Sequence, residues 1–337
     1  MAMISTSRRK FITTLTIGML SLCCERASAS SESTLPTVKL ASFSDGATDA
    51  TAAIQSLIDS CPSAGGVISI PKGKYLIDCV KGVTLRSGVH LILSSDAYLL
   101  AKPTSMGTYA ILKIYNVKNV TIEGGNIVGE RGKHLGTVGE WGFGIDIRGS
   151  SNVIIRDSHI SNCWGDGIYV AASNRYGKEV DCHNVTIERV TCKNNRRQGL
   201  SITGCETALI LDSTFSFTHG TRPASGIDLE AEKGGTVDSI VIKNCDVSDN
   251  FGRGIQLNNK NSMIKIINCT INRNHEYGVW IGGETEGIEI SGNEARNNGI
   301  YDLFVGKSVN LLRLGSKMMT STTPGSGGFK LIYIDRK

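Results

Sequence analysis

The segment NVTIERVTCKNNRRQGLSI, residues 184–202, sets a pattern that three later segments follow. These read TALILDSTFSFTHGTRPASGIDL (207–229), SIVIKNCDVSDNFGRGIQL (239–257) and MIKIINCTINRNHEYGVWI (263–281). Each contains an alternating apolar run, a polar corner, a glycine and a second alternating run. The same register starts at seven positions, which are Asn119, Asn152, Asn184, Thr207, Ser239, Met263 and Gly287. The last two intervals are 24 residues each and three others are longer by insertion, so the pattern predicts a solenoid.

Two apolar rows follow these starts and identify the kind of solenoid. The row one place after each start is Val120, Val153, Val185, Ala208, Ile240, Ile264 and Ile288. The row two places further on is Ile122, Ile155, Ile187, Ile210, Ile242, Ile266 and Ile290. Alternation over runs this short predicts strands with one buried face rather than helices. Stacked strands of successive turns must then pair in parallel, about 4.8 Å apart. The pattern therefore predicts an all-β fold, a single-stranded parallel β-helix.

A polar corner separates the two strands of each turn. Its row contains Asn195, Asn250, Asn274 and Asn298. Asparagine tolerates the left-handed backbone of a tight corner, and stacked amides can hydrogen-bond from turn to turn. The glycines that open the second strand are Gly144, Gly167, Gly199, Gly226, Gly254 and Gly278.

Residues 1–29 are predicted to be an export signal of the twin-arginine type. Residues 7–12 read SRRKFI, an apolar segment follows, and Ala27-Ser28-Ala29 supplies a cleavage site. A basic N-terminal tail is the alternative, but it explains neither the apolar run nor the cleavage site. We therefore expect a periplasmic or secreted protein, and no other stretch is apolar and long enough to span a membrane.

The charge balance narrows the choice of partners. Removing residues 1–29 removes four Lys/Arg and one Glu, so the formal net charge falls from +5 to +2. A nearly neutral protein gives no indication of a nucleic-acid partner. An acidic polysaccharide would have to be held by a local basic cluster.

Ten cysteines in an exported chain raise the question of disulfides. Cys182 and Cys205 each lie two places before a strand start in turns that should be neighbours, so we predict a disulfide between them. Cys61 and Cys79 form a second, weaker candidate pair. Cys245 and Cys269 occupy an inward row and are better interpreted as buried thiols. No Cys or His spacing indicates a metal site.

Residues 45–77 predict an N-terminal cap. Asp49 can begin an amphipathic helix that runs through Ile58, and a solenoid needs such a cap over its exposed apolar end. Residues 306–337 lose the repeat, and we expect them to form a C-terminal cap that includes a last strand at Phe329–Ile334.

The run 45–77, followed by VTLRSGVHLIL at residues 83–93, resembles the N-terminal portion of the pectate-lyase superfamily. It is most similar to the subgroup that contains rhamnogalacturonases, mannuronan epimerases and phage tailspikes. The resemblance implies a right-handed parallel β-helix over residues 30–305. It implies no single reaction, because these proteins include hydrolases, lyases, epimerases and non-catalytic binders.

The outward face of the second strand carries the candidate site. Two places after each glycine stand Asp146, Tyr169, Ser201, Asp228, Gln256 and Trp280. Insertions flank this strand on both sides, at 130–143, 172–181, 219–225 and 231–238. Loops on both sides would wall the strand face into a groove, and solenoid insertions often gather on the binding face. A groove lined by carboxylates, arginines and aromatic rings predicts a polysaccharide as partner.

Asp228 and Glu230 are the predicted catalytic pair, with Asp166 as a third carboxylate. Two strand rises separate the Cα atoms of Asp228 and Glu230 by about 6.6 Å, which suits the wider carboxylate pair of inverting glycosidases. One acid would protonate the leaving oxygen while the other activates water. Plain solvated strand residues are the alternative interpretation. The predicted substrate-binding residues are Asp146, Tyr169, Arg197, His219, Arg253, Gln256 and Trp280.

Other chemistries stay open on this sequence. The Asp-Asp pair and Gly-His-Gly motif of polygalacturonase-like hydrolases are absent, and Thr218-His219-Gly220 is only a partial match. A hydrolase would need no cofactor. A lyase or epimerase would take its base from Arg253, Arg197, Tyr169 or His219, with Ca²⁺ held by the three carboxylates. A non-catalytic glycan-binding or structural β-helix is the second class of function.

Overall fold

The computed structural model describes residues 40–318, except 233, 307–308 and 310–311. The chain divides into two compact units, Met1–Leu35 and Pro36–Lys337, and the described residues belong to the second. The predicted export signal and the predicted last strand at 329–334 lie outside the described residues.

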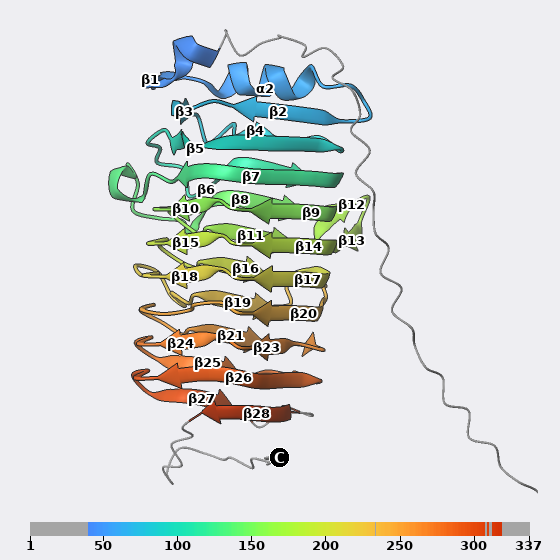
Figure 1. The fold of residues 1–337 in the computed structure, drawn as a ribbon, viewed down its shortest axis with the longest axis vertical. Helices are drawn as coiled ribbons and strands as arrows, with labels where there is room; N and C mark the ends of the chain where they lie inside the picture. The colour runs from blue at the N-terminus through green and yellow to red at the C-terminus, as the bar shows by residue number, and fades with distance from the viewer. Residues whose placement is uncertain (1–39, 233, 307–308, 310–311, 319–337) are drawn as a thin grey trace, which may run out of the picture. The chain divides into compact units, whose positions relative to one another are not determined.

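The described unit is a stack of coils whose strands form two long sheets and one short hairpin (Figure 1). The first sheet contains β1 (Asp45–Asp49), β2 (Gly66–Ile70), β3 (Gly73–Ile77), β5 (Val89–Ala101), β7 (Lys118–Val128), β9 (Ser151–Arg156), β10 (His159–Ser161), β14 (Cys182–Glu188), β15 (Thr191–Lys193), β17 (Cys205–Leu211), β18 (Thr214–Ser216), β20 (Val237–Lys243), β22 (Asn261–Ser262), β23 (Lys265–Ile267), β24 (Thr270–Asn272), β26 (Ile288–Arg296) and β28 (Leu312–Met318). The second sheet contains β4 (Val83–Thr84), β6 (Thr108–Tyr115), β8 (Trp141–Arg148), β11 (Ile168–Ala171), β16 (Leu200–Ile202), β19 (Ile227–Glu230), β21 (Ile255–Asn258), β25 (Tyr277–Ile281) and β27 (Tyr301–Val305). The hairpin pairs β12 (Ser173–Arg175) with β13 (Lys178–Val180) in antiparallel fashion. The helices are η1 (Ala41–Phe43), α2 (Thr51–Asp59) and η2 (Arg131–Lys133).

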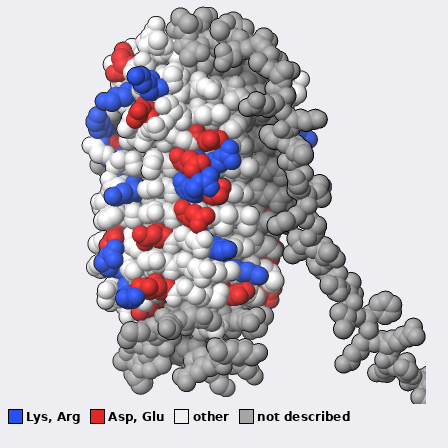
Figure 2. Space-filling model, in the orientation of Figure 1, with Lys and Arg blue, Asp and Glu red and all other residues white. Residues whose placement is uncertain are grey.

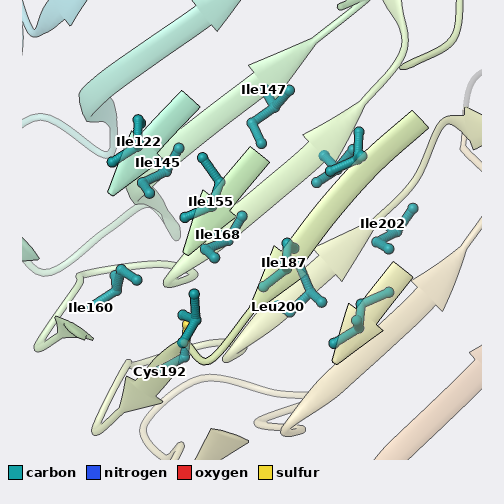
Figure 3. Packing of buried hydrophobic residues seen from close by; sticks show 14 of the residues in the cluster. Ile122, Ile145, Ile147, Ile155, Ile160, Ile168, Ile187, Cys192, Leu200 and Ile202 are labelled. Carbon is teal, nitrogen blue, oxygen red and sulfur yellow. The ribbon is translucent and has the colours of Figure 1, made fainter. Parts of the chain in front are cut away.

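The strand register confirms the repeat read from the sequence. Val185 pairs in parallel with Val153 of one neighbouring coil and Ala208 of the other. All three side chains are buried, as are the isoleucines two places further on. Figure 3 shows that side chains from both sheets meet in the interior, among them Ile122, Ile145, Ile155, Ile168, Ile187 and Leu200. Each fully buried side chain of this size stabilises the fold by about 1.5–3 kcal/mol, so these rows hold the coils together.

The asparagine corner behaves as predicted in its hydrogen bonds but not in its backbone. Asn250 Nδ2 donates to Asn274 Oδ1 at 2.9 Å, and Asn274 Nδ2 donates to Asn298 Oδ1 at 3.0 Å. The left-handed residue, however, is the one before the ladder position: Asn194, with φ of 57°, precedes Asn195. The ladder amides are turned into the interior, so the chain reverses one residue earlier.

The N-terminal cap is confirmed. Helix α2 begins at Thr51, whose backbone N–H donates to Asp49 Oδ1 at 2.9 Å, and it buries Ile54 and Ile58. Strand β1 already pairs in parallel with β3, so the coil starts before the helix. Among the described residues, no helix is both long enough and apolar enough to cross a membrane.

The predicted C-terminal boundary at residue 305 is wrong. Strand β28 pairs in parallel with β26, with Leu312 opposite Ile288, so the solenoid continues to Met318. The repeat is hard to detect in this coil because no asparagine follows Asn310 in the sequence. The corner asparagine that marks the earlier coils is therefore missing here.

The predicted Cys182–Cys205 disulfide is also wrong in this structure. The two residues lie opposite each other in register, as expected, but both are free thiols. Cys182 Sγ donates to Ala171 O at 3.3 Å, whereas Cys205 Sγ donates to Thr207 O, so the two sulfurs point to different carbonyls. Cys61 and Cys79 are free as well, and Cys245 and Cys269 are buried thiols as predicted.

Candidate functional site

The outer face of the second sheet carries the predicted polar row. Successive coils place Asp146, Tyr169, Ser201, Asp228, Gln256 and Trp280 in register. Ile227 and Leu229 point into the core and have no exposed surface. Because side chains alternate along a strand, Asp228 and Glu230 face outward. The prediction that both carboxylates share one outer face is therefore confirmed.

The insertions lie at both ends of these strands. Residues 129–140 lead into β8, and residues 217–226 lead into β19, whereas the β12–β13 hairpin follows β11. The first loop is fastened to an earlier coil, because Leu135 N donates to Thr104 O at 2.9 Å. Figure 1 shows the hairpin at one edge of the coils and the green loop with η2 at the other. Loops thus flank the outer face of the second sheet on each side, and we refer to this loop-flanked face as the groove.

Asp166 stands where this groove meets the corner. Its side chain is fully buried, and Oδ2 accepts hydrogen bonds from Arg197 Nη1 at 2.9 Å and Ser201 Oγ at 2.8 Å. Oδ1 has no hydrogen-bond partner among the described residues. Burial raises the pKa of Asp166 to about 6, although the Arg197 charge opposes the rise. Arg197 therefore keeps this buried carboxylate ionised at neutral pH.

Asp228 lies in the row beside Ser201 and is only 3% exposed. Its Oδ2 accepts from Gln198 Nε2 at 2.8 Å, while Oδ1 has no partner among the described residues. Burial first, and then the charge of Glu230, raise the pKa of Asp228 to about 8. Asp228 consequently holds its proton at neutral pH, as an acid catalyst must.

Glu230 is more exposed than the two aspartates. Its Oε1 accepts from Asn258 Nδ2 at 2.8 Å and from Asn259 Nδ2 at 3.0 Å. Partial burial and the neighbouring Glu232 raise the pKa of Glu230 above its ordinary value. The groove thus holds a protonated acid and a solvent-accessible carboxyl two residues apart on one strand.

An aromatic and cationic surface continues the groove toward the last coils. The guanidinium carbon of Arg253 lies 4.1 Å from the Trp280 ring centroid, and Trp280 stacks on Phe304 with centroids 5.9 Å apart. Arg253 also donates to Gln256 and forms an ion pair with Glu276. The predicted grouping of Arg253, Gln256 and Trp280 is confirmed.

A second aromatic group lies toward the earlier coils. Tyr169 stacks on Phe143 with ring centroids 4.5 Å apart, and the Arg148 guanidinium lies 5.2 Å from the Tyr169 centroid. Arg148 Nε also donates to Asp146 at 2.9 Å, and Tyr115 donates to the same carboxylate. Asp146 is therefore a buried ion-pair partner that fixes Arg148, rather than an exposed ligand.

His219 does not join the groove, contrary to the sequence prediction. The backbone N–H of Thr218 donates to the ladder residue Asn250, so the chain at His219 is still in the corner. The imidazole bonds to Phe217 O through Nδ1 and lines a hollow with Phe251 and His275. Residues 220–226 separate it from the start of β19, and no motif marks where that insertion turns.

Sequence reasoning missed Gln198 as the partner of Asp228. Gln198 stands in the row directly before the glycines, together with Asp166 and Arg253, and the hydrogen bond crosses from one coil to the next. Ser201 was in the outward row but received no role, although it holds Asp166. The aligned repeats could have indicated both residues, because each lies beside a carboxylate of an adjacent coil.

Protein donors surround the groove carboxylates. Arg197, Ser201, Gln198 and Asn258 all donate to them. Across the described residues, no group of three or more His, Cys, Asp or Glu side chains is arranged to hold a metal ion. Figure 2 shows acidic and basic side chains interspersed on the face in view.

Comparisons with known proteins agree with this architecture. The family model described as "Right handed beta helix region" matches residues 76–235 and 181–316. The uncharacterized protein YclG of Bacillus subtilis is 33% identical over 219 residues, covering 58% of this chain and 37% of that protein. The SPbeta prophage-derived uncharacterized protein YorA of the same bacterium is 32% identical over 217 residues, covering 56% and 37%. The matched part thus spans well under half the length of these two relatives.

Solved structures share the fold at low sequence identity. The N-terminal fragment of bacteriophage Phi29 gene product 12 superposes with a TM-score of 0.57 and 15% identity, covering 82% of this chain and 57% of that one. Pectate lyase Pel9A gives a TM-score of 0.54 and 12% identity, covering 68% and 60%. The iota-carrageenase of family GH82 from A. fortis gives 0.52 and 16%, covering 75% and 57%.

Proposed function

The chain belongs to the right-handed β-helix family, and from that premise we propose that its groove hydrolyses a polysaccharide. The observation that carries the proposal is the pairing of Asp228 and Glu230 on the outer face of β19. Asp228 is buried and protonated at neutral pH, whereas Glu230 reaches solvent. An acid and a base with different environments on one face are what general acid–base hydrolysis requires.

In the proposed reaction, Asp228 donates its proton to the glycosidic oxygen as the bond from that oxygen to the anomeric carbon breaks. Glu230 accepts a proton from a water molecule, and the water oxygen forms the new bond to the anomeric carbon. The products are two shorter sugar chains, one with a new reducing end. Alternate positions on one strand place the two Cα atoms about 6.6 Å apart. Carboxyl groups separated by a similar distance would leave room for a water between them, so we expect inversion at the anomeric carbon.

Asp166 acts in this proposal as a positioning residue. It holds the Arg197 guanidinium and the Ser201 hydroxyl, and Ser201 lies in register beside Asp228. Arg197 in turn supplies a positive charge that lowers the pKa of Asp228 against the effect of burial. Its charge and its donors are also suited to a carboxylate or sulfate on the substrate.

The aromatic groups at either side of the carboxylates supply sugar subsites. Trp280 and Phe304 extend the surface toward the last coils, with Arg253 over the indole. Tyr169, which stacks on the buried ring of Phe143, does the same toward the earlier coils. Proteins of this fold include a pectate lyase and an iota-carrageenase, which supports a polysaccharide as the substrate class. The predicted export signal suits a substrate outside the cell, so we propose a periplasmic or secreted enzyme.

Elimination from a uronate is a second candidate. Arg197 and Arg253 both lower the pKa of Asp228 through their charges, so cations as well as acids face the middle of the groove. Asp166, Asp228 and Glu230, the predicted Ca²⁺ ligands, are not arranged to hold a metal ion in the described part of the chain, so a lyase of this kind would neutralise the substrate carboxylate with Arg197 or Arg253.

The test is incubation of the protein with a panel of neutral, uronate and sulfated polysaccharides. We expect new reducing ends, no ultraviolet absorbance from an unsaturated sugar, and turnover that survives a calcium chelator. Unsaturated products would replace hydrolysis by elimination. Binding with no product from any polysaccharide would leave a non-catalytic glycan-binding protein.

A further inference from the structure

A second surface of chemical interest lies along the corner closed by the asparagine ladder. The residue that follows the ladder position is exposed in the later coils and buried in the earliest one, and backbone hydrogen bonds connect these residues from coil to coil. Thus His219 N donates to Asn195 O at 3.1 Å, and His275 N donates to Asn250 O at 2.8 Å. We call this set the corner row; its members are Trp164, Arg196, His219, Phe251 and His275. All five side chains are planar groups with delocalised electrons.

The later half of the corner row borders a hollow of about 620 Å³. Its other side is formed by residues just before the ladder, including Lys193, Phe217 and Arg273. Phe217 is 44% exposed and Phe251 is 52% exposed, so two phenyl rings face solvent in one hollow. None of the lining residues belongs to the second sheet, and the hollow is therefore distinct from the groove.

The rings in the hollow are ordered by stacking. Phe251 and His275 lie nearly parallel, with centroids 4.7 Å apart and an interplanar angle of 16°. The Lys193 ammonium lies 4.7 Å from the Phe217 ring centroid. Arg273 is held by Asp249 through two hydrogen bonds of 2.8 and 2.7 Å. The hollow thus combines fixed aromatic faces with cations at its edge.

We propose that the hollow is a second binding site, for a segment of an anionic polysaccharide that lies along the stacking axis. Aromatic faces bind the apolar C–H faces of sugar rings, and Lys193 and the imidazoles at the edge suit a carboxylate or sulfate. Coils repeat about every 4.8 Å, close to the length of one sugar unit, so a repeating row matches a repeating ligand. The site goes beyond the proposed hydrolysis and does not depend on it.

The test measures binding alone, by electrophoresis of the full chain through gels that contain alginate, iota-carrageenan or neutral dextran. Alginate carries carboxylates and iota-carrageenan carries sulfates, so the two gels separate the two kinds of anion. For the double variant F251A/H275A we expect the Kd for at least one anionic glycan to rise about fivefold or more, since both rings of the stacked pair are lost. Tyr98→Ala, which removes an exposed ring from β5, is the matched control and should stay within about twofold.

To distinguish binding in the groove from binding in the hollow, the measurement is repeated with W280A, which lacks the indole of the groove. Binding to the anionic gels that persists in W280A and is lost in W280A/F251A/H275A supports the hollow. Unchanged binding in F251A/H275A, equal retardation in dextran, or no retardation of the native chain in either anionic gel would overturn the proposal. Thermal melting of each variant shows that the fold is intact, and none of these readouts requires catalysis.

Discussion

Gln198 fixes the carboxyl group of Asp228 by a hydrogen bond of 2.8 Å from Nε2 to Oδ2. The same amide accepts from Ser225 N at 2.8 Å through Oε1, so its orientation is set by the backbone of the next coil. With Oδ2 occupied, the proton of Asp228 belongs on Oδ1, the oxygen that has no partner among the described residues. Gln198 thereby determines which oxygen of Asp228 carries the proton.

Replacing Asp228 should remove turnover while sparing the fold. Asp228→Asn keeps the shape but cannot donate the proton, and loss of an acid catalyst costs about 10²–10⁴-fold in kcat. We expect kcat for the best polysaccharide to fall in that range. Asp157→Asn, a change at an exposed carboxylate of the first sheet's face, is the control and should retain native kcat. Native turnover by Asp228→Asn would remove Asp228 from the mechanism.

The pH dependence follows from the same residue. Asp228 must be protonated, and its pKa is about 8, so we expect kcat/KM to decline as the pH rises above about 8. Gln198→Ala removes a donor that favours the ionised form, and it should move this alkaline limb to higher pH. Gln55→Ala, in α2, should leave the limb unchanged. An alkaline limb that is the same in Gln198→Ala and the native chain would contradict the assigned contact.

Stability should fall between pH 4 and pH 8. The folded pKa of Asp228 is about 8 and its ordinary value is 3.8, so the folded chain retains a proton that the unfolded chain has lost. The stability associated with protonated Asp228 is fully present below the pKa of the unfolded chain, 3.8, and is lost as the pH rises through the folded pKa of about 8. Asp166, with a pKa raised to about 6, acts in the same direction. Melting temperatures across this range should therefore decline less in Asp228→Asn than in the native chain; parallel curves would show that Asp228 is not buried as described.

The aromatic surface should govern substrate affinity more than the chemical step. Trp280→Ala removes the ring that lies under Arg253 and that is proposed to contact the sugar. We expect KM to rise about fivefold to thirtyfold with a smaller change in kcat, since a contact of the substrate with this surface is worth about 1–2 kcal/mol. Trp280→Phe should recover most of the affinity. If kcat falls and KM is unaltered, Trp280 acts on the reacting bond instead.

The asparagine ladder should be costly to interrupt. Asn274→Ala removes four side-chain hydrogen bonds, two accepted from Asn250 and one donated to each of Asn298 and Val247, and leaves their groups unpaired. We expect a loss of about 2–5 kcal/mol in the free energy of unfolding, measured by urea denaturation. Asn272→Ala, which breaks one bond to Arg296 N on an exposed strand, should cost less than about 1 kcal/mol. Equal losses would show that the ladder has no special role.

Much of this architecture was readable from periodicity. The apolar rows fix which residues point inward, and that alternation alone predicts that Asp228 and Glu230 point outward with Gln256 and Trp280. The capping helix followed from the same reasoning, because an open solenoid end must be covered. These features depend on the spacing of residues along the chain, which is what a sequence records.

Other features depend on where an insertion turns or where a side chain points. His219 was misplaced because residues 220–225 conceal the end of the corner. The register of Cys182 and Cys205 was predicted, but the direction of each sulfur depends on neighbouring carbonyls. The burial of Asp166 and the contact from Gln198 to Asp228 arise between coils, across 31 and 30 residues of chain, so no local pattern signals them.

Proton NMR of a fresh digest is the sharpest test of hydrolysis by Asp228 and Glu230, because it reports the chemistry and the stereochemistry of the first product together. With the polysaccharide that gives most product, we expect a new reducing end whose anomeric configuration is opposite to that of the bond cleaved, and no such product from Asp228→Asn. An unsaturated product, a retained configuration, or the same product from Asp228→Asn would contradict hydrolysis by Asp228 and Glu230.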